Sequence, residues 1–394
     1  MDINLNLIFV IIFAGGWIFS KLFSKIKLPA VLGMVVFGIL CSIFIKDSSP
    51  GILWELSPFL KSFALIVILS RAGLGISKSA LKKVGKTAIL MSFVPCIIEG
   101  TALTFLLHYL FDFSYEVSGL TGFMLAAVSP AVIVPSMLNL KENGRGKKND
   151  VPTIILAGAS IDDIFAITIF SVFLGLSRGT SPEIIKTIIS VPLSVTAGIV
   201  SGIICGFLLS LFFKKYHSSV RATEKVLIVL VFATTLVRLG DVLHFAALLG
   251  VMTCGFIILE MHEKIAHELS AKLSKIWIFA EIILFVLIGF SLDVDTAFTA
   301  GPKALIAITI GLLFRSIGVF IATAFSDLTL KERVFCMIAY IPKATVQAAL
   351  GGVALSYGIK GGETILSIAV VSILFTAPLG LIGIRSTEKY LLKN

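Results

Sequence analysis

Residues 127–136 read AVSPAVIVPS, a stretch that places two prolines inside a long apolar run. Proline lacks the backbone N–H of a helical hydrogen bond, and its ring clashes with the preceding turn. A helix that passes through Pro130 and Pro135 is therefore expected to break. Residues 341–352, IPKATVQAALGG, combine Pro342 with a lysine and a glycine pair in a second apolar run, so a second break is expected there.

The composition is that of a membrane protein. Of the 394 residues, 57% are hydrophobic and 14% are charged, whereas a soluble domain carries roughly 25% charged residues. Apolar runs of about 18 to 25 residues recur along the chain, each long enough to cross a hydrocarbon core of roughly 30 Å as a helix. The sequence therefore predicts one all-α polytopic membrane domain over residues 1–394 and excludes a soluble fold.

The apolar runs predict about thirteen membrane helices, and the Lys and Arg residues orient them. These basic residues concentrate in the loops after odd-numbered runs, as in residues 78–86 and 141–148. By the positive-inside rule, the N-terminus lies outside and the C-terminus in the cytoplasm of a multi-pass protein of the cell (inner or plasma) membrane. The net charge of +10 therefore reflects topology rather than a nucleic-acid partner. The runs lie near residues 5–23, 29–46, 59–76, 86–111, 118–139, 151–176, 184–213, 225–239, 243–260, 275–292, 303–325, 333–357 and 364–384.

The two interrupted helices hold equivalent positions in two halves of the chain. Each is the fifth predicted helix of its half, over residues 1–183 and 225–394, with residues 184–224 as a linker helix and loop. Their offset is an odd number of helices, which predicts inverted-topology repeats. Interrupted helices at matching positions of such repeats indicate a transport site, because free carbonyls and half-helix ends bind ions there. Ordinary proline kinks are the structural alternative.

Residues 158–166 read GASIDDIFA and place adjacent carboxylates inside an apolar run. A carboxylate at that depth costs at least roughly 2.5 to 3.5 kcal/mol, so it normally pairs or lines a wet cavity. Neighbouring helix positions point about 100° apart, which predicts different roles for the two. Asp163 is predicted to carry the cation and the proton in turn, since oxygen ligands suit Na⁺ or Li⁺ and burial favours protonation. Asp162 is predicted to meet Lys343, and a purely structural Asp–Lys pair is the alternative.

Other polar residues sit in apolar runs. Glu99 and Arg315 are predicted to form a buried ion pair with a structural or gating role. Ser129, Thr345 and Gln347 are candidate neutral ligands near the helix breaks, with packing as the alternative.

Glu281 is a third acid in an apolar run, and it is assigned equally to a cytoplasmic funnel or to packing. The five cysteines show no CxxC or Cys/His spacing, which gives no support to a disulfide or metal site. The sequence contains no HExxH or GxSxG signature, so we expect neither an enzyme nor a cofactor.

Four motifs together resemble the monovalent cation:proton antiporter superfamily, specifically the NHA-type sodium/proton antiporters: LPAVLG at 28–33, VSPA at 128–131, GASIDD at 158–163 and IPKATVQA at 341–348. The resemblance spans nearly the whole chain. It implies an NhaA-like antiporter fold, a homodimer, and a mobile core of crossed broken helices that moves in an elevator-like way. The compact chain, without the longer soluble termini of animal relatives, resembles a bacterial member.

The same resemblance assigns roles to individual residues. It implies that Asp163 is the ion-binding carboxylate, that its neighbour Asp162 pairs with Lys343, and that Glu99 and Arg315 form the ion pair of the core. Na⁺ or Li⁺ would then be bound at Asp163 and Asp162 as the transported cation.

The expected function is antiport of Na⁺ or Li⁺ against H⁺, driven by an inward proton gradient and contributing to pH homeostasis. K⁺/H⁺ exchange is an alternative, because selectivity depends on cavity size and ligand number. A sodium-coupled organic-anion symporter of related architecture is another, although buried acids favour a small cation. A channel would need a continuous pore. The expected partners are small monovalent cations, protons and the lipid bilayer.

Overall fold

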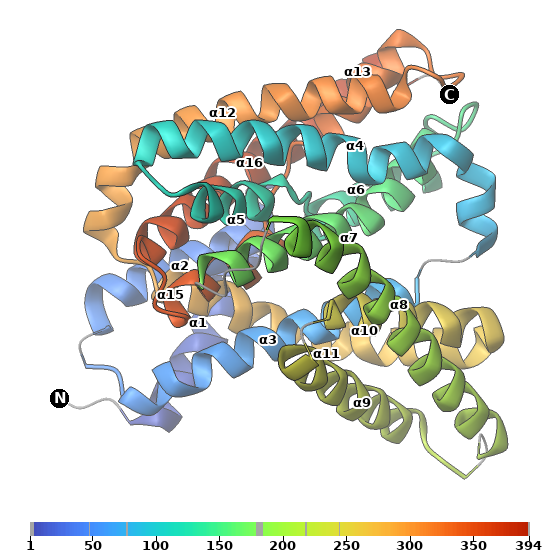
Figure 1. Ribbon diagram of the computed structural model, residues 1–394, viewed down its shortest axis with the longest axis horizontal. Helices are drawn as coiled ribbons and strands as arrows, with labels where there is room; N and C mark the ends of the chain where they lie inside the picture. The colour runs from blue at the N-terminus through green and yellow to red at the C-terminus, as the bar shows by residue number, and fades with distance from the viewer. Residues whose placement is uncertain are drawn as a thin grey trace. The chain divides into compact units, whose positions relative to one another are not determined.

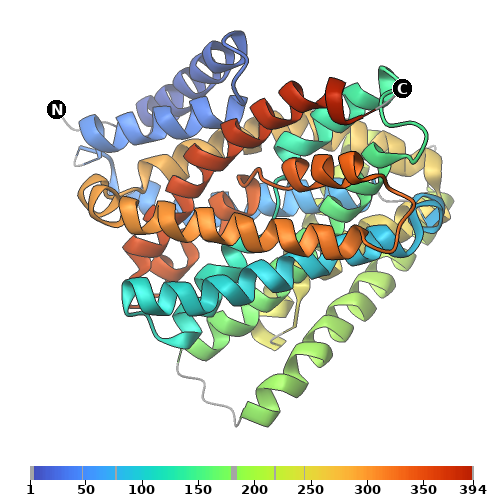
Figure 2. The same cartoon turned by 90° about the horizontal axis from the view of Figure 1, so that it is seen from above.

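The structure is a computed structural model that describes residues 4–46, 48–75, 78–178, 184–216, 219–243 and 245–392. Every regular element in these residues is a helix (Figures 1 and 2). The helices are α1 (Leu5–Lys25), α2 (Ala30–Ile45), α3 (Gly51–Gly73), α4 (Lys78–Phe111), α5 (Tyr115–Ala126), α6 (Pro130–Glu142), α7 (Val151–Ser177), α8 (Ile184–Lys215), α9 (Ala222–Leu243), α10 (Ala247–Met261), α11 (Glu263–Phe290), α12 (Val294–Thr323), α13 (Leu330–Ala339), α14 (Thr345–Leu350), α15 (Val353–Ser356) and α16 (Gly362–Leu391).

Within the described residues, 8 helices are long and apolar enough to cross a membrane by length and composition. The predicted all-helical fold with several membrane spans is confirmed, whereas the number thirteen and the inverted repeats stay predictions. The eight helices are Leu5–Lys25, Gly51–Gly73, Gly85–Phe111, Val151–Ser177, Thr196–Lys215, Glu263–Phe290, Val294–Thr323 and Gly362–Leu391.

Several helices extend beyond the apolar runs that predicted them. α11 begins at Glu263 rather than near residue 275, and α12 begins at Val294 rather than near residue 303. Lys, Glu and Ala are good helix formers, so a helix can extend past the end of its apolar run. Its first residue is then determined by an N-cap rather than by hydrophobicity. For α12 that cap is Asp293, whose side chain accepts the Thr296 N–H at 2.7 Å.

The chain consists of two compact units, one formed by Met1–Pro58, Val84–Thr180 and Ile282–Asn394 and the other by Phe59–Lys83 and Ser181–Glu281. Each unit contains segments from both predicted halves, because compactness and repeat symmetry are different properties. The repeat boundaries stay a prediction.

In the second unit α8 and α10 pack closely. A Cβ on Gly202 would lie 2.3 Å from the carbonyl oxygen of Gly250, so this contact requires a glycine.

In the first unit α4 and α12 run side by side (Figures 1 and 2). A Cβ on Gly318 would lie 2.6 Å from the Cα of Pro95, and one on Gly311 would lie 2.9 Å from the Leu103 side chain. Glu99 lies between the two contacts on α4, and the equivalent position on α12 is residue 315. The close packing therefore brings these two charged positions face to face.

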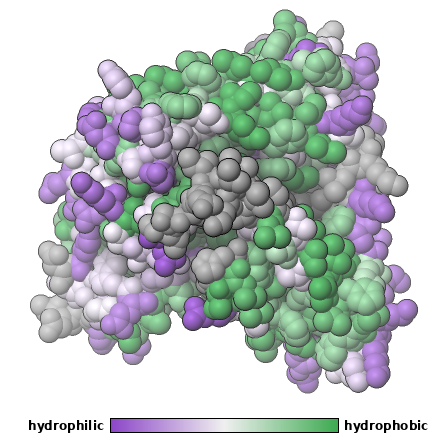
Figure 3. Space-filling view, in the orientation of Figure 1, coloured by the Kyte–Doolittle hydropathy of each residue, from purple (hydrophilic) through white to green (hydrophobic). Residues whose placement is uncertain are grey.

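The outer face over α4 and α12 is mostly apolar, and hydrophilic residues gather at its sides (Figure 3). This is the surface expected of helices that face lipid, whose polar groups lie toward the helix ends.

Two helices of the first unit are interrupted. Residues 127–129 separate α5 from α6, and residues 340–344 separate α13 from α14. The two interruptions meet, because the N–H of Ser129 donates to the carbonyl of Pro342 at 2.8 Å. The breaks predicted at Pro130 and Pro342 are present.

The predicted break of this helix lies directly before Pro130 and not at Pro135, because α6 continues through Pro135 to Glu142. A proline inside a helix removes one backbone hydrogen bond, and a membrane helix tolerates this loss when neighbouring groups satisfy the freed carbonyl. The side chains of Pro130 and Pro135 lie outside the described part of the structure.

Candidate functional site

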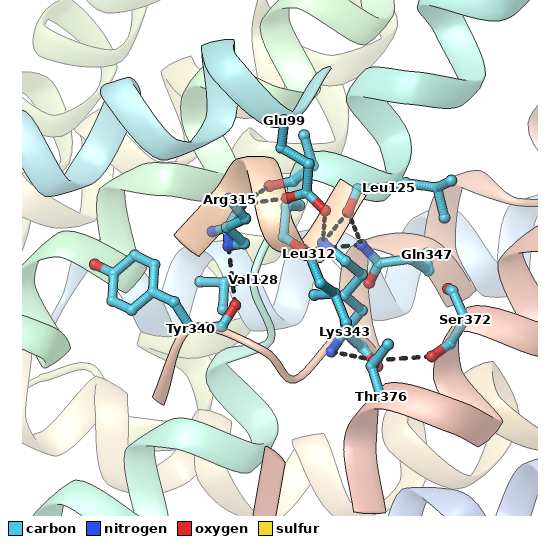
Figure 4. A network of polar contacts seen from close by, with 12 residues as sticks. Glu99, Leu125, Val128, Leu312, Arg315, Tyr340, Lys343, Gln347, Ser372 and Thr376 are labelled. Atoms are coloured by element: carbon cyan, nitrogen blue, oxygen red, sulfur yellow. Dashed lines mark hydrogen bonds and ion pairs between the residues drawn. The ribbon is translucent and has the colours of Figure 1, made fainter. Parts of the chain in front are cut away.

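The C-terminal end of α5 is contacted by two cationic side chains. The last carbonyls of any helix have no partner within that helix. Here Arg315 Nη1, from α12, donates to the carbonyl of Ala126, and Lys343 Nζ donates to the carbonyl of Leu125 (Figure 4). A helix C-terminus carries a partial negative charge, so both cations are placed favourably.

The amide of Gln347 completes this cap. Its Nε2 atom donates to the carbonyl of Met124 at 2.9 Å and to that of Ala127 at 3.0 Å. Gln347 lies on α14, so the second interrupted helix holds the end of the first.

Four buried charged side chains form one network in the first unit. Arg315 Nη1 lies 2.8 Å from Glu99 Oε2, and Arg315 Nη2 lies 3.1 and 3.0 Å from the two carboxylate oxygens of Asp162. Lys343 Nζ lies 2.7 Å from Glu99 Oε1. None of the four is more than 1% exposed. The formal charges cancel, which is what makes buried charges tolerable at membrane depth.

The predicted ion pair of Glu99 and Arg315 is present in this network, but the predicted contact between Asp162 and Lys343 is wrong. Asp162 is bound by Arg315 and by the N–H of Val128 at 2.9 Å, while Lys343 lies on Glu99. A guanidinium presents its donors in a planar fork and can bind two carboxylates at once, whereas an ammonium is a point charge. Arg315 therefore reaches both carboxylates.

Asp163 is the acid of α7 that the network leaves out. It is buried, at 6% exposed, and has no ion pair among the described residues. Its Oδ1 atom also has no hydrogen-bond partner there. A buried polar atom without a partner is rare in proteins and calls for an explanation.

The three predicted neutral ligands carry similar oxygens. Ser129 is the N-cap of α6 and Thr345 is the first residue of α14. Their hydroxyls and Gln347 Oε1 are buried and have no hydrogen-bond partner among the described residues. Hydroxyl, amide and carboxylate oxygens are the ligands that hard cations prefer. The described residues contain no group of three or more His, Cys, Asp or Glu that could hold a metal ion.

One face of α16 packs against residues 342 and 343 and holds the backbone of Lys343 in place. The Lys343 N–H donates to Thr376 Oγ1 at 2.9 Å, and that hydroxyl donates to the carbonyl of Ser372 at 2.8 Å. One turn further, a Cβ on Gly380 would lie 2.2 Å from the ring of Pro342. No sequence pattern singles out Thr376, because a threonine in a membrane helix commonly bonds a carbonyl of its own helix.

Replacing Thr376 with valine is expected to lower the free energy of unfolding by roughly 1–3 kcal/mol, because the Lys343 N–H loses its buried acceptor. The melting temperature of the purified protein in detergent measures this effect. Thr376→Ser keeps the Oγ atom and should stay close to wild type. Equal melting temperatures for the valine and serine variants would show that this hydrogen bond contributes nothing.

Glu281 belongs to the second unit, which contains the part of α11 up to this residue, whereas the groups described above belong to the first unit. It is half-buried, and Arg71 of the same unit is the charged residue whose field acts on it. Its assignment to a funnel or to packing stays a prediction. All five cysteines are described, buried and free of disulfides.

Two crossing interrupted helices that enclose a balanced set of buried charges, in a chain with several membrane-length helices, define a secondary transporter. The chain belongs to the sodium/hydrogen exchanger family, since residues 8–386 match the family described as "Sodium/hydrogen exchanger, transmembrane".

Individual relatives agree with this assignment. Sodium/hydrogen exchanger 9B2 of Homo sapiens is 34% identical over 409 residues, which cover 96% of this chain and 75% of the relative. Sodium/hydrogen exchanger 9B1 of Mus musculus is 34% identical over 395 residues, which cover 95% and 69%. The sodium proton antiporter MjNhaP1 from Methanocaldococcus jannaschii, at pH 8, shares the fold with a TM-score of 0.79 at 21% identity, over 96% of each chain.

The predicted membership of the cation:proton antiporters is thereby confirmed. The chain is an integral membrane protein, and its family exchanges cations for protons across the membrane.

Proposed function

We propose that this protein exchanges Na⁺ or Li⁺ for H⁺ by alternating access, with Asp163 binding the cation and the proton in turn. The observation that carries this proposal is the environment of Asp163, which is buried beside a balanced network and has an oxygen with no hydrogen-bond partner in the described part of the chain. Arg315 neutralises Asp162, so the charge that changes when a proton or a cation binds is that of Asp163.

The same environment supplies a reason for coupling. When Asp163 binds a proton or a monovalent cation, the carboxylate and its bound ion together carry no net charge. The site can then change the side of the membrane to which it is open at a small cost in free energy. When it is empty it is a buried unpaired anion, which is expensive at membrane depth. The loaded forms therefore cross and the empty form does not, and this is the condition for exchange rather than leak.

The neutral oxygens are proposed as the other cation ligands. Ser129, Thr345 and Gln347 each carry, next to a helix break, a buried oxygen to which no described residue is hydrogen-bonded. Carboxylate and neutral oxygens in such a set suit Na⁺ or Li⁺. Asp162 is proposed to act on this site by fixing the first break, since it accepts the Val128 N–H.

The remaining charged groups are proposed to hold the crossing together while the exposure of the site changes. Glu99 links Arg315 to Lys343, and these two cations bind the end of α5. All of these groups belong to the first unit, so an elevator-like movement would carry that unit with its cargo.

We place the protein in the cell membrane with the N-terminus outside and the C-terminus in the cytoplasm, an orientation that follows from the distribution of basic residues. The proposed homodimer rests on the resemblance to the cation:proton antiporters. An inward proton gradient would then drive extrusion of Na⁺ or Li⁺ and contribute to pH homeostasis.

Proteoliposomes with an imposed pH gradient test the proposed exchange. Addition of Na⁺ or Li⁺ should dissipate the gradient rapidly in a saturable manner, and K⁺ should have little effect. Dissipation by K⁺ alone would establish the K⁺/H⁺ alternative. A folded protein that responds to none of the three cations would contradict the proposal and favour a sodium-coupled organic-anion symporter.

A further inference from the structure

Tyr340 is a buried aromatic residue whose hydroxyl the proposed mechanism does not use. It follows the last residue of α13, at the start of the non-helical segment 340–344, and it is 0% exposed. Its carbonyl accepts a hydrogen bond from Arg315 Nε at 2.9 Å. The hydroxyl has no hydrogen-bond partner among the described residues.

The hydroxyl lies against α7, at the helical turn that precedes Asp162. A Cβ built on Gly158 would lie 2.1 Å from the hydroxyl oxygen and 3.0 Å from the Cβ of Met91, so the oxygen occupies the space that a larger residue would need. Gly158 precedes Asp162 by one helical turn and shares its face of α7. Helical side chains lean toward the N-terminus, so the Asp162 carboxylate leans over this same turn.

Charged groups surround this position from two directions. The Arg315 guanidinium lies 5.3 Å from the centre of the Tyr340 ring, and the hydroxyl points away from it (Figure 4). The charged and titratable groups whose fields act on the hydroxyl are Asp162 and Asp163 on α7, Arg315 on α12 and the Cys336 thiol on α13.

A hydroxyl in this position is unfavourable for the fold alone. Its neighbours Met91, Ala159, Cys336 and Ala339 belong to one buried apolar cluster with Tyr340. Burying a hydroxyl there without a partner costs free energy that a phenylalanine would avoid. The group is therefore expected to gain a partner in some state of the transport cycle.

We propose that the Tyr340 hydroxyl is a hydrogen-bonding group of the transport site. It donates, through one water molecule, to the Asp162–Asp163 carboxylates when a cation is bound. A donor to the charged form of a carboxylate stabilises that form, and the ionised carboxylate is the form that binds Na⁺ or Li⁺. Tyr340 thereby raises cation affinity. This inference rests on the proposed exchange at Asp163.

Tyr340→Phe tests the proposal, because it removes one oxygen and keeps the ring. In proteoliposomes the KM for Na⁺ and for Li⁺ should rise roughly twofold to tenfold, the range expected for one hydrogen bond. The value of kcat should stay within about twofold, since the hydroxyl acts on cation binding. The melting temperature should equal or exceed that of wild type, because an unpartnered buried hydroxyl is lost. Tyr390→Phe, at a residue 77% exposed, is the matched control and should change neither quantity.

Asp163→Asn is measured beside these variants to separate the two proposals. If Asp163→Asn is inactive and Tyr340→Phe has the KM of wild type, the role of Tyr340 is overturned and the exchange proposal stands. A lower melting temperature for Tyr340→Phe would reveal a structural partner for the hydroxyl and would also overturn it. If Asp163→Asn retains exchange, the proposed function itself fails.

Discussion

Asp163→Asn is expected to reduce cation-dependent proton movement to the level of protein-free liposomes. The amide is nearly the same size as the carboxylate but neither binds a proton in this pH range nor supplies a negative charge for Na⁺ or Li⁺. The fold should be retained, because Asp163 has no ion pair among the described residues and Asn adds no charge to the buried site. Dissipation of an imposed pH gradient measures the activity, and the melting temperature in detergent measures the fold.

Asp295→Asn provides the matched control, since it removes an exposed carboxylate from the first turn of α12. Exchange by this variant should equal that of wild type. Measurable Na⁺- or Li⁺-dependent exchange by a folded Asp163→Asn protein would show that the carrier is another group. Asp162 would then be the first group to examine, because it is the neighbouring acid on α7.

The helix breaks and the buried acids could be predicted because each depends on a local property of the sequence. Pro130 and Pro342 lack a backbone donor wherever they stand, and a carboxylate such as Asp163 is costly in any apolar run. These properties place a group at a depth in the membrane. They do not say how a helix is rotated or which neighbour it faces.

The partners of the charged groups depend on that rotation, and here sequence reasoning failed. Lys343 was matched with Asp162 by charge and depth, yet its ammonium lies on Glu99. The deciding feature is the packing of α4 against α12, where Gly311 and Gly318 allow a close approach around Arg315. No pattern in either helix alone reveals this contact.

Two polar groups near the helix breaks were also missed, because their sequence context is ordinary. Thr376 lies in an apolar helix and Tyr340 lies at a helix end, and neither side chain carries a formal charge. The importance of Thr376 follows from the Lys343 N–H, a backbone donor that the helix break leaves free. That of the Tyr340 hydroxyl follows from its position against Gly158 on α7. Both contacts join residues far apart in the sequence, so they are seen only in three dimensions.

Arg315→Met is expected to produce the largest loss of stability, a decrease of roughly 3–5 kcal/mol in the free energy of unfolding. Arg315 binds Glu99 and Asp162 and also donates to the carbonyls of Ala126 and Tyr340. Methionine replaces the unbranched apolar stem of the arginine side chain but has none of these donors. Asp162 then loses its ion pair while it stays 0% exposed. The melting temperature in detergent measures the loss.

Lys303→Met is the control for this change, because it removes an exposed cation from the same helix, and exposed charges contribute roughly 0–1 kcal/mol. The physical cause is tested by adding Asp162→Asn to Arg315→Met, because the double variant keeps only the Glu99–Lys343 pair, whose charges cancel. If the loss comes from a carboxylate left buried without a counter-charge, the double variant should be more stable than Arg315→Met alone. A double variant no more stable than the single one would show instead that the loss comes from the missing hydrogen bonds of Arg315 to the helix breaks rather than from its charge.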